Sequence, residues 1–335
     1  MITEQDIVAS PNWFPLQRSG DELRWVRLDE SAYRAASFLD QRLLSNNYPQ
    51  AVTPLGMARS AGASLAPRSH YIFHTGHVGS TLISRLIGTH ESLFCLREPP
   101  LLRALSQGLP QGGGDELDLR SVLALLSRTW RPTQRAVIKA TSFVSELAGE
   151  ILGTDADARA ILMFADPISY LRTILGGPNS RVEAQHLASA RLARLARRLS
   201  GDSWRPDASS EGEQIAMAWL CEMTALWAAA ERHGSRVMWV NFDAFLAQPA
   251  VVLGRVFQAL GVAAAGNEIE ALVQGPLMQQ YSKAPEYAYD AALRRDVQRE
   301  AEMEHGAEIR RGARWLERLA GEPVVSRVLE VARQG

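Results

Sequence analysis

The sequence predicts an α/β fold with a parallel β-sheet of about five strands, flanked by helices on both faces. Short runs of Ile, Val, Phe and Met recur along the chain, and each run is apolar throughout instead of alternating with polar residues. Strands that are covered on both faces have this pattern, because neither face meets water. The runs lie at 70–75, 93–98, 135–141, 159–166 and 236–243.

Helical patterns fill the intervals between these runs. Strands that alternate with helices predict a parallel sheet with helices on both sides. The stretch from 286 to 333 has no strand pattern and predicts helices packed on a flank. The other predicted helices span 80–89, 116–129, 142–152, 167–175, 181–200, 211–233 and 249–260.

The N-terminal part of the chain departs from this alternation. Residues 1–66 contain LRWVRLDESAYRAASFLD, in which a strand-like piece precedes a helical one. We therefore predict an N-terminal extension over 1–66 that packs on a main α/β domain over 67–335. A chain of 335 residues is long enough for one large domain with such a satellite.

The composition is that of a soluble globular protein, with 46% hydrophobic and 22% charged residues. The formal net charge of −1 gives no reason to expect a nucleic acid or a membrane surface as partner. Cys95 and Cys221 form no CxxC pair, which predicts two reduced core thiols and no metal site. The acidic N-terminus does not resemble a signal peptide, so we predict a cytoplasmic protein. No pattern predicts an oligomeric state.

The segment YIFHTGHVGSTLISRLI predicts a strand, a turn with Gly76 and Gly79, and a helix that begins near Ser80. Glycines let the backbone approach an anion closely and adopt positive φ. The free N–H groups and the positive dipole end of the helix then bind the negative charge. Ser80 and Thr81 add hydroxyl donors. This arrangement is typical of a phosphate-binding loop.

The loop lacks the lysine of an ATP-binding P-loop. That motif is GxxxxGK[ST], whereas Ser80 follows Gly79 here. A metal-dependent ATPase is therefore disfavoured. A plain structural interpretation also stays open, in which Gly76 and Gly79 only form a tight turn between strand and helix.

The pattern H-T-G-x-x-G-S-T-L-x-x-x-L-I resembles the 5′-phosphosulfate loop of the sulfotransferases, whose donor is 3′-phosphoadenosine 5′-phosphosulfate (PAPS). Five further segments resemble this family, mainly its bacterial members, and follow in the family's order. They are REPP at 97–100, VIKATSF at 137–143, ADPISYLRT at 165–173, NFDAFLAQP at 241–249 and QQYSKAPEYAYD at 279–290. The opening NWFPLQRSGDELRWVRL is similar to the same subgroup.

The resemblance implies a P-loop-NTPase-like sulfotransferase fold that transfers a sulfuryl group from PAPS, without a metal, to a hydroxyl or amine of a small molecule or glycan. Lys139 is implied to stabilise charge on the bridging oxygen as the sulfuryl group leaves. Thr173 and Lys283 are implied to contact the 3′-phosphate. The residues implied to hold the 5′-phosphate are Gly76, His77, Val78, Gly79, Ser80 and Thr81.

Glu98 is the candidate general base, because a carboxylate within hydrogen-bond reach of the acceptor can take its proton. In the cytosolic branch of the family a histidine two residues after the lysine does this, but Thr141 occupies that position here. In other branches a glutamate takes the role. An ion pair of Glu98 with Arg97 or Arg103, without a chemical role, is the alternative.

Two positions depart from the family. His77 stands where the loop normally carries a lysine or arginine, and Ala165 replaces the arginine of the 3′-phosphate motif. The loss of one charge-assisted contact costs about 1.5–3 kcal/mol, or roughly ten- to a hundredfold in affinity. A protonated His77, or Arg172 or Lys283, could compensate for it.

Three interpretations of function therefore stay open. The protein is an active sulfotransferase, or it binds a nucleotide or a partner on the same fold without transfer. In the third, it transfers phosphoryl groups, with Ser80 or Thr81 and Asp166 holding magnesium.

The acceptor itself is not predicted, because variable loops such as 107–116 and 201–213 build acceptor pockets. Trp204, Trp219 and Trp227 could line an apolar acceptor pocket. At helical spacing, however, Trp219 and Trp227 are also typical of a core.

Overall fold

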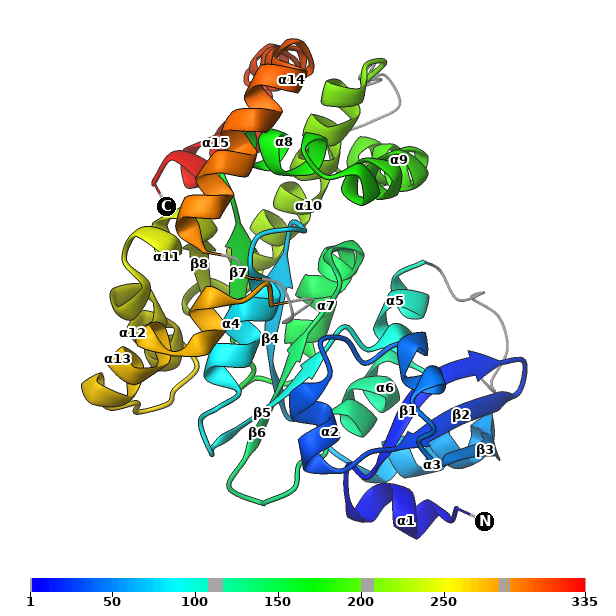
Figure 1. Ribbon diagram of the computed structural model, residues 1–335. Helices are drawn as coiled ribbons and strands as arrows, with labels where there is room; N and C mark the ends of the chain where they lie inside the picture. The colour runs from blue at the N-terminus through cyan, green and yellow to red at the C-terminus, as the bar shows by residue number, and fades with distance from the viewer. Residues whose placement is uncertain (1, 108–116, 200–207, 283–287, 289, 335) are drawn as a thin grey trace.

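The computed structural model describes residues 2–107, 117–199, 208–282, 288 and 290–334 (Figure 1). At its centre lies a five-stranded sheet in the order β5-β6-β4-β7-β8, and every neighbouring pair of strands is parallel. The α/β fold class predicted from the sequence is confirmed. The strands are β4 (Ser69–His74), β5 (Leu93–Arg97), β6 (Arg135–Lys139), β7 (Ala160–Phe164) and β8 (Val237–Asn241).

Both faces of this sheet are buried, which explains the apolar runs. Ile72, Val137 and Met163 belong to the core cluster on one face, whereas Phe73 and Ile138 belong to the cluster on the other. Successive side chains of a strand alternate between its faces, so a strand that is covered twice needs apolar residues at every position.

Helices cover the two faces, as predicted. Buried side chains of α4 and α8 belong to one core cluster, and buried side chains of α6 and α7 belong to the other. The helices at or near predicted positions are α4 (Ser80–Ile87), α6 (Leu119–Leu126), α7 (Ala148–Gly153), α8 (Pro167–Leu175), α9 (Pro178–Leu199), α10 (Glu211–His233), α12 (Pro249–Ala259), α14 (Ala291–Leu319) and α15 (Pro323–Gln334).

Several shorter elements were not predicted, because one or two turns leave too little periodicity to detect. The first half of the helix predicted over 142–152 is a 3-10 turn instead, η2 (Ser142–Leu147), which precedes α7. The other short elements are α5 (Pro100–Ser106), α11 (Phe242–Ala247), α13 (Gly266–Gln274), η1 (Gln41–Ser45), η3 (Gly234–Arg236) and η4 (Pro276–Gln279).

The N-terminal part carries an antiparallel sheet of its own, in the order β1-β2-β3. The sequence predicted the β2 strand and the α2 helix, but not the rest of this unit. Pro15 accounts for part of the miss, because the register shifts between Pro15 and Gln17 and interrupts the alternation of β1. The elements are α1 (Glu4–Ala9), β1 (Trp13–Ser19), β2 (Glu22–Arg27), α2 (Glu30–Ala35), β3 (Gln50–Pro54) and α3 (Leu55–Ser64).

The N-terminal unit shares a core cluster with the central sheet and packs beside β5 (Figure 1). The Tyr33 ring meets the Phe94 ring edge-on, with 5.0 Å between centroids. Arg97, the last residue of β5, donates from Nε to the Ala36 carbonyl over 2.8 Å and from Nη2 to the carbonyls of Tyr33 and Arg34. Burial lowers the pKa of Arg97 to about 10. These hydrogen bonds fix the end of β5 against the N-terminal unit. The domain boundary at residue 66 stays a prediction.

Cys95 and Cys221 are free and buried, as predicted. Burial raises the pKa of the Cys95 thiol to about 11 and that of Cys221 to about 12. Within the described part of the chain, no helix is long and apolar enough to cross a membrane.

Candidate functional site

The loop between β4 and α4 has the backbone shape of a phosphate-binding turn. Gly76, His77 and Gly79 have φ angles of 99°, 54° and 67°, a region that residues with a side chain rarely adopt. A Cβ on Gly79 would lie 2.0 Å from Cε2 of Phe242, the first residue of α11. The second glycine is therefore required by a close contact as well as by the turn.

His74, at the end of β4, fixes the start of this loop. Its Nε2 lies 2.8 Å from the Ala140 carbonyl, and its Nδ1 accepts a hydrogen bond of 3.0 Å from the Gly76 N–H. The neutral imidazole with its proton on Nε2 satisfies both contacts. Gly76 was predicted to offer its N–H to a phosphate. In this conformation that N–H is already donated, so Gly76 supplies the shape of the loop.

A pocket of about 350 Å³ opens at the N-terminus of α4. Ser80 and Thr81 line it, and so does Phe242. Thr81 is 1% exposed, and its Oγ1 has no hydrogen-bond partner among the described residues. A buried hydroxyl without a partner is costly unless a ligand or water satisfies it. Together with the free N–H groups of the first helical turn, it suits a bound anion.

Arg294 of α14 brings a guanidinium group into the same pocket. It donates from Nη2 to the Ser169 Oγ over 3.1 Å and from Nε to the Asp243 Oδ1 over 3.0 Å. Ser169 belongs to the segment that resembles the 3′-phosphate motif. A guanidinium has five N–H donors, so donors remain for an anion. Sequence reasoning missed Arg294, because nothing distinguishes it from the other arginines of α14.

Ala165, where the family has an arginine, is buried in the core. Its carbonyl accepts a hydrogen bond of 2.9 Å from the Trp219 Nε1. Trp219 is itself fully buried, and Trp227 packs against the same core cluster. Of the two interpretations weighed from the sequence, the core therefore holds for Trp219 and Trp227, and the apolar acceptor pocket does not. Trp204 lies outside the described residues.

Thr173 lines the pocket, and its contact with a 3′-phosphate stays a prediction. Its hydroxyl donates to the Ser169 carbonyl over 2.8 Å and accepts from the Gln298 Nε2 at 3.3 Å. Arg172, expected as a compensating cation, instead pairs with Glu302 of α14 at 2.8 Å. It lines a separate depression between α8 and α14. Lys283 lies outside the described residues, so its role stays a prediction.

The two residues between the glycines differ in environment. Val78 is 1% exposed and belongs to the core, which anchors the middle of the loop. His77 faces α9, with its Nδ1 3.4 Å from the Ser180 Oγ and its Nε2 3.7 Å from a carboxylate oxygen of Glu183. The partners of His77 therefore come from a helix that begins nearly 100 residues later in the chain.

The two candidate catalytic residues form an ion pair with each other. Lys139 ends β6 and is fully buried, and its Nζ donates to the Glu98 Oε1. Glu98 directly follows β5 and has a φ angle of 56°, while its N–H continues the ladder to the Lys139 carbonyl at 2.7 Å. A non-glycine residue held in this region marks a position that the surrounding structure dictates. The pairing of Glu98 with Arg97, weighed from sequence, is wrong, because Arg97 turns toward α2.

A second, smaller pocket lies on the Glu98 side of the loop. Glu98 lines it together with Arg103 of α5, but the ion pair of Glu98 that the described residues show is with Lys139 and not with Arg103. His74, His77 and Ser180 line both pockets. The phosphate loop therefore separates two pockets that meet at its tip.

Asp166, weighed as a magnesium ligand, caps a helix instead. Its Oδ1 accepts hydrogen bonds of 3.0 Å from the N–H groups of Ile168 and Ser169 at the start of α8. That position uses the carboxylate to satisfy the free N–H groups of α8.

Comparisons with known proteins were made by sequence and by structure. No protein-family model and no curated protein matches the sequence. The structure is similar to solved sulfotransferases. The mouse sulfotransferase SULT7A1 complexed with PAP is 12% identical, with 82% of this chain and 93% of that chain covered and a TM-score of 0.43.

Two other solved structures show a comparable likeness. The sulfotransferase domain from the curacin biosynthetic pathway is 15% identical, covers 75% of this chain and 98% of that chain, and has a TM-score of 0.42. The sulfotransferase from Alicyclobacillus acidocaldarius is 17% identical, covers 58% and 82%, and has a TM-score of 0.38. At these identities and TM-scores the likeness is one of fold, and it carries no function over to this chain.

The Gly79–Phe242 contact predicts the effect of a small substitution. Gly79→Ala places a methyl group into the Phe242 ring and forces a strained φ, so we expect the free energy of unfolding to fall by about 2–4 kcal/mol. Urea denaturation followed by tryptophan fluorescence measures this change. Gly266→Ala is the matched control, because a Cβ there meets nothing within 4 Å. A loss below about 0.5 kcal/mol for Gly79→Ala, the range of ordinary surface changes, would show that the contact is not required.

Proposed function

We propose that the protein is a sulfotransferase that moves a sulfuryl group from PAPS to a hydroxyl or amine of an acceptor. The observation that carries this proposal is the Lys139–Glu98 pair, which lies beside an anion-binding loop at the carboxyl edge of a parallel sheet. Open α/β sheets bind their ligands at this edge. A buried cation and a carboxylate at this position supply the two charges that the transfer needs.

In this proposal the pocket at α4 holds the nucleotide part of the donor. The hydroxyls of Ser80 and Thr81, with the first N–H groups of α4, bind the 5′-phosphate. Arg294 and Thr173 contact the 3′-phosphate from the opposite wall. Arg294 thus supplies, from α14, the guanidinium that position 165 lacks. A planar guanidinium is well suited to phosphate oxygens.

In the transfer step, Glu98 and Lys139 take up the proton that is released and the negative charge that develops. The acceptor oxygen or nitrogen forms a bond to sulfur, and the bond between sulfur and the bridging phosphate oxygen breaks. Glu98 takes the proton that the acceptor loses. Lys139 stabilises the negative charge that develops on the leaving oxygen, which becomes part of 3′-phosphoadenosine 5′-phosphate. Before donor binding, the ion pair compensates the two charges for their loss of water.

Two observations bear on the alternatives. Arg294 restores a cation to the donor pocket, which weakens the argument for a protein that binds without transfer. Asp166 is engaged at the start of α8, which disfavours a magnesium site built from Asp166 with Ser80 or Thr81.

Donor binding is the first test of this proposal. We expect isothermal titration with 3′-phosphoadenosine 5′-phosphate to show micromolar binding, and Arg294→Ala to weaken it about ten- to a hundredfold through the lost charge-assisted bonds. Arg295→Ala, an exposed neighbour on the same helix, is the matched control. No binding to the unaltered protein, or stronger binding of magnesium-ATP, would overturn the proposal.

The role of Glu98 is tested by transfer. Glu98→Gln keeps the size of the side chain but cannot accept a proton, so we expect transfer of labelled sulfuryl groups to acceptors to fall about a hundredfold or more. Binding of 3′-phosphoadenosine 5′-phosphate should change by less than about threefold. Glu91→Gln, which alters an exposed carboxylate just before β5, is the control. Full activity of Glu98→Gln would remove Glu98 from the role of base.

A further inference from the structure

The pocket on the Glu98 side of the loop is small and polar. Its volume is about 80 Å³, whereas one water takes about 30 Å³ of the liquid. It therefore has room for a small polar group, such as the oxyanion of a larger molecule. Its lining residues include Thr75, Thr141, Arg103 and Arg191.

The two threonines carry hydroxyls without a hydrogen-bond partner among the described residues. Thr75 is fully buried, and its Oγ1 has no hydrogen-bond partner among the described residues; the same holds for the Oγ1 of Thr141. Buried polar groups in folded proteins almost always bond to protein, water or ligand. The two hydroxyls therefore indicate a site that is completed by a polar ligand.

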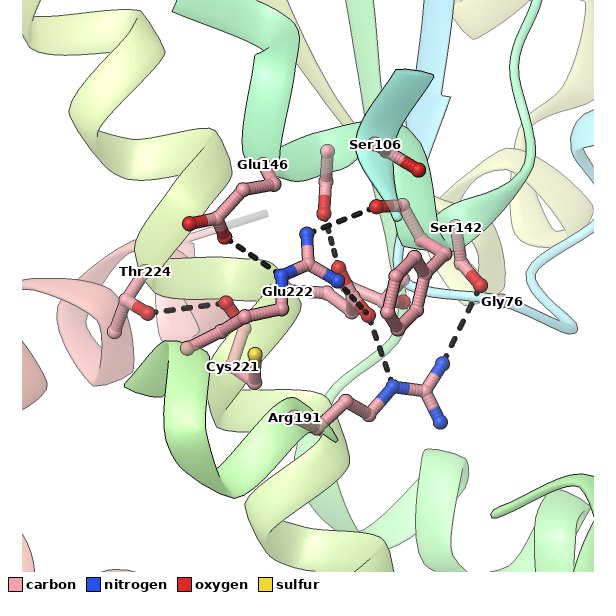
Figure 2. Close-up of polar contacts among 12 residues, drawn as sticks. Gly76, Ser106, Ser142, Glu146, Arg191, Cys221, Glu222 and Thr224 are labelled. Carbon is pink, nitrogen blue, oxygen red and sulfur yellow. Dashed lines mark hydrogen bonds and ion pairs between the residues drawn. The ribbon is translucent and has the colours of Figure 1, made fainter. Parts of the chain in front are cut away.

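Arg191 belongs to a buried network behind the pocket (Figure 2). It is 4% exposed, donates from Nε to the Glu222 Oε1 over 2.9 Å, and reaches the Ser142 Oγ with Nη2 at 3.4 Å. Glu222 is fully buried on α10 and also accepts a hydrogen bond from Ser145 of η2. These contacts hold Arg191 in place at the pocket wall.

The same network carries more positive than negative charge. Arg194 and Arg198 of α9 share the carboxylate of Glu146, and Arg194 also lies 4.0 Å from Glu222. With Arg191, three guanidinium groups thus face two carboxylates. A buried surplus of positive charge favours an anion nearby, because the low local dielectric strengthens the attraction.

The carboxylates of the pocket do not cancel this surplus. Glu98 is paired with Lys139, and the Glu183 side chain is 51% exposed, so water screens its charge. Arg103, an exposed residue on α5, adds a further cation at the opposite wall. The pocket is therefore electropositive on the side away from Glu98.

We propose that this pocket is the acceptor subsite, and that the acceptor carries an oxyanion in addition to the hydroxyl or amine that receives the sulfuryl group. Arg191 and Arg103 bind the carboxylate, phosphate or sulfate of the acceptor, and its reacting group faces Glu98. This inference rests on the proposed function, since it names the substrate class of the same site. It replaces the apolar acceptor pocket that the tryptophans suggested in the sequence.

The test measures sulfuryl transfer from PAPS by this protein to matched pairs of acceptors. Each comparison sets an anionic hydroxy compound against a neutral counterpart. Glycerate and glycerol phosphate are each compared with glycerol, and hydroxybenzoate is compared with its methyl ester. We expect kcat/KM to be about tenfold or more higher for the anionic member, as for one charge-assisted contact. The carboxylate and phosphate arms tell which oxyanion is preferred.

Variants then connect this preference to the pocket. Arg103→Gln should reduce the ratio of anionic to neutral kcat/KM about tenfold, mainly through KM, and Thr75→Val should reduce it less. Arg191→Lys keeps a charge beside Glu222 and tests the planar fork without leaving that carboxylate unpaired. Arg255→Gln, an exposed arginine on α12, is the control.

The outcomes separate this inference from the proposed function. Binding of 3′-phosphoadenosine 5′-phosphate is measured for every variant, so a failed donor site is detected independently of the acceptor. The inference would be overturned if the protein binds 3′-phosphoadenosine 5′-phosphate but prefers neutral acceptors or does not distinguish acceptors by charge. Transfer that reaches no anionic acceptor would overturn it as well. An unchanged ratio in Arg103→Gln and Arg191→Lys would overturn the assigned pocket.

Discussion

The buried ammonium of Lys139 is the constraint on which the rest of the site depends. At the end of a central strand it has no access to water, so it needs a counter-charge within reach. Glu98 supplies that charge from the end of the next strand, in a backbone conformation with positive φ. Arg97 fixes the same strand end through hydrogen bonds to the carbonyls of Tyr33, Arg34 and Ala36 at the end of α2. The N-terminal unit therefore helps to position the candidate base.

The phosphate loop divides the space around this pair. On one side, the N-terminus of α4, Arg294 and the Thr81 hydroxyl, which has no partner among the described residues, line the pocket that we propose for the donor nucleotide. On the other side, Glu98 and Arg191 line a small polar pocket. His77, at the loop tip, lines both pockets, and Glu98 lines the second. In the proposed function, donor and acceptor therefore bind in separate pockets, with Glu98 at the acceptor side.

Sequence reasoning succeeded where the information is local. Apolar runs of six to eight residues located the strands of the central sheet, and glycine spacing located the loop. It failed where the information is long-range: Arg294 contacts Ser169 across 125 positions, and several arginines of α14 look alike in the pattern. The ion pair of Lys139 with Glu98 spans 41 positions, so each residue was predicted alone, but not their contact. Pro15 hid the first strand of the N-terminal sheet for a local reason, since it interrupts the alternation.

The most direct test of this account is a crystal structure of the protein with 3′-phosphoadenosine 5′-phosphate. The account predicts the 5′-phosphate within hydrogen-bond distance of the Ser80 and Thr81 hydroxyls, the 3′-phosphate beside Arg294, and the second pocket still open next to Glu98. A nucleotide bound away from α4, or a 3′-phosphate that avoids Arg294, would contradict it.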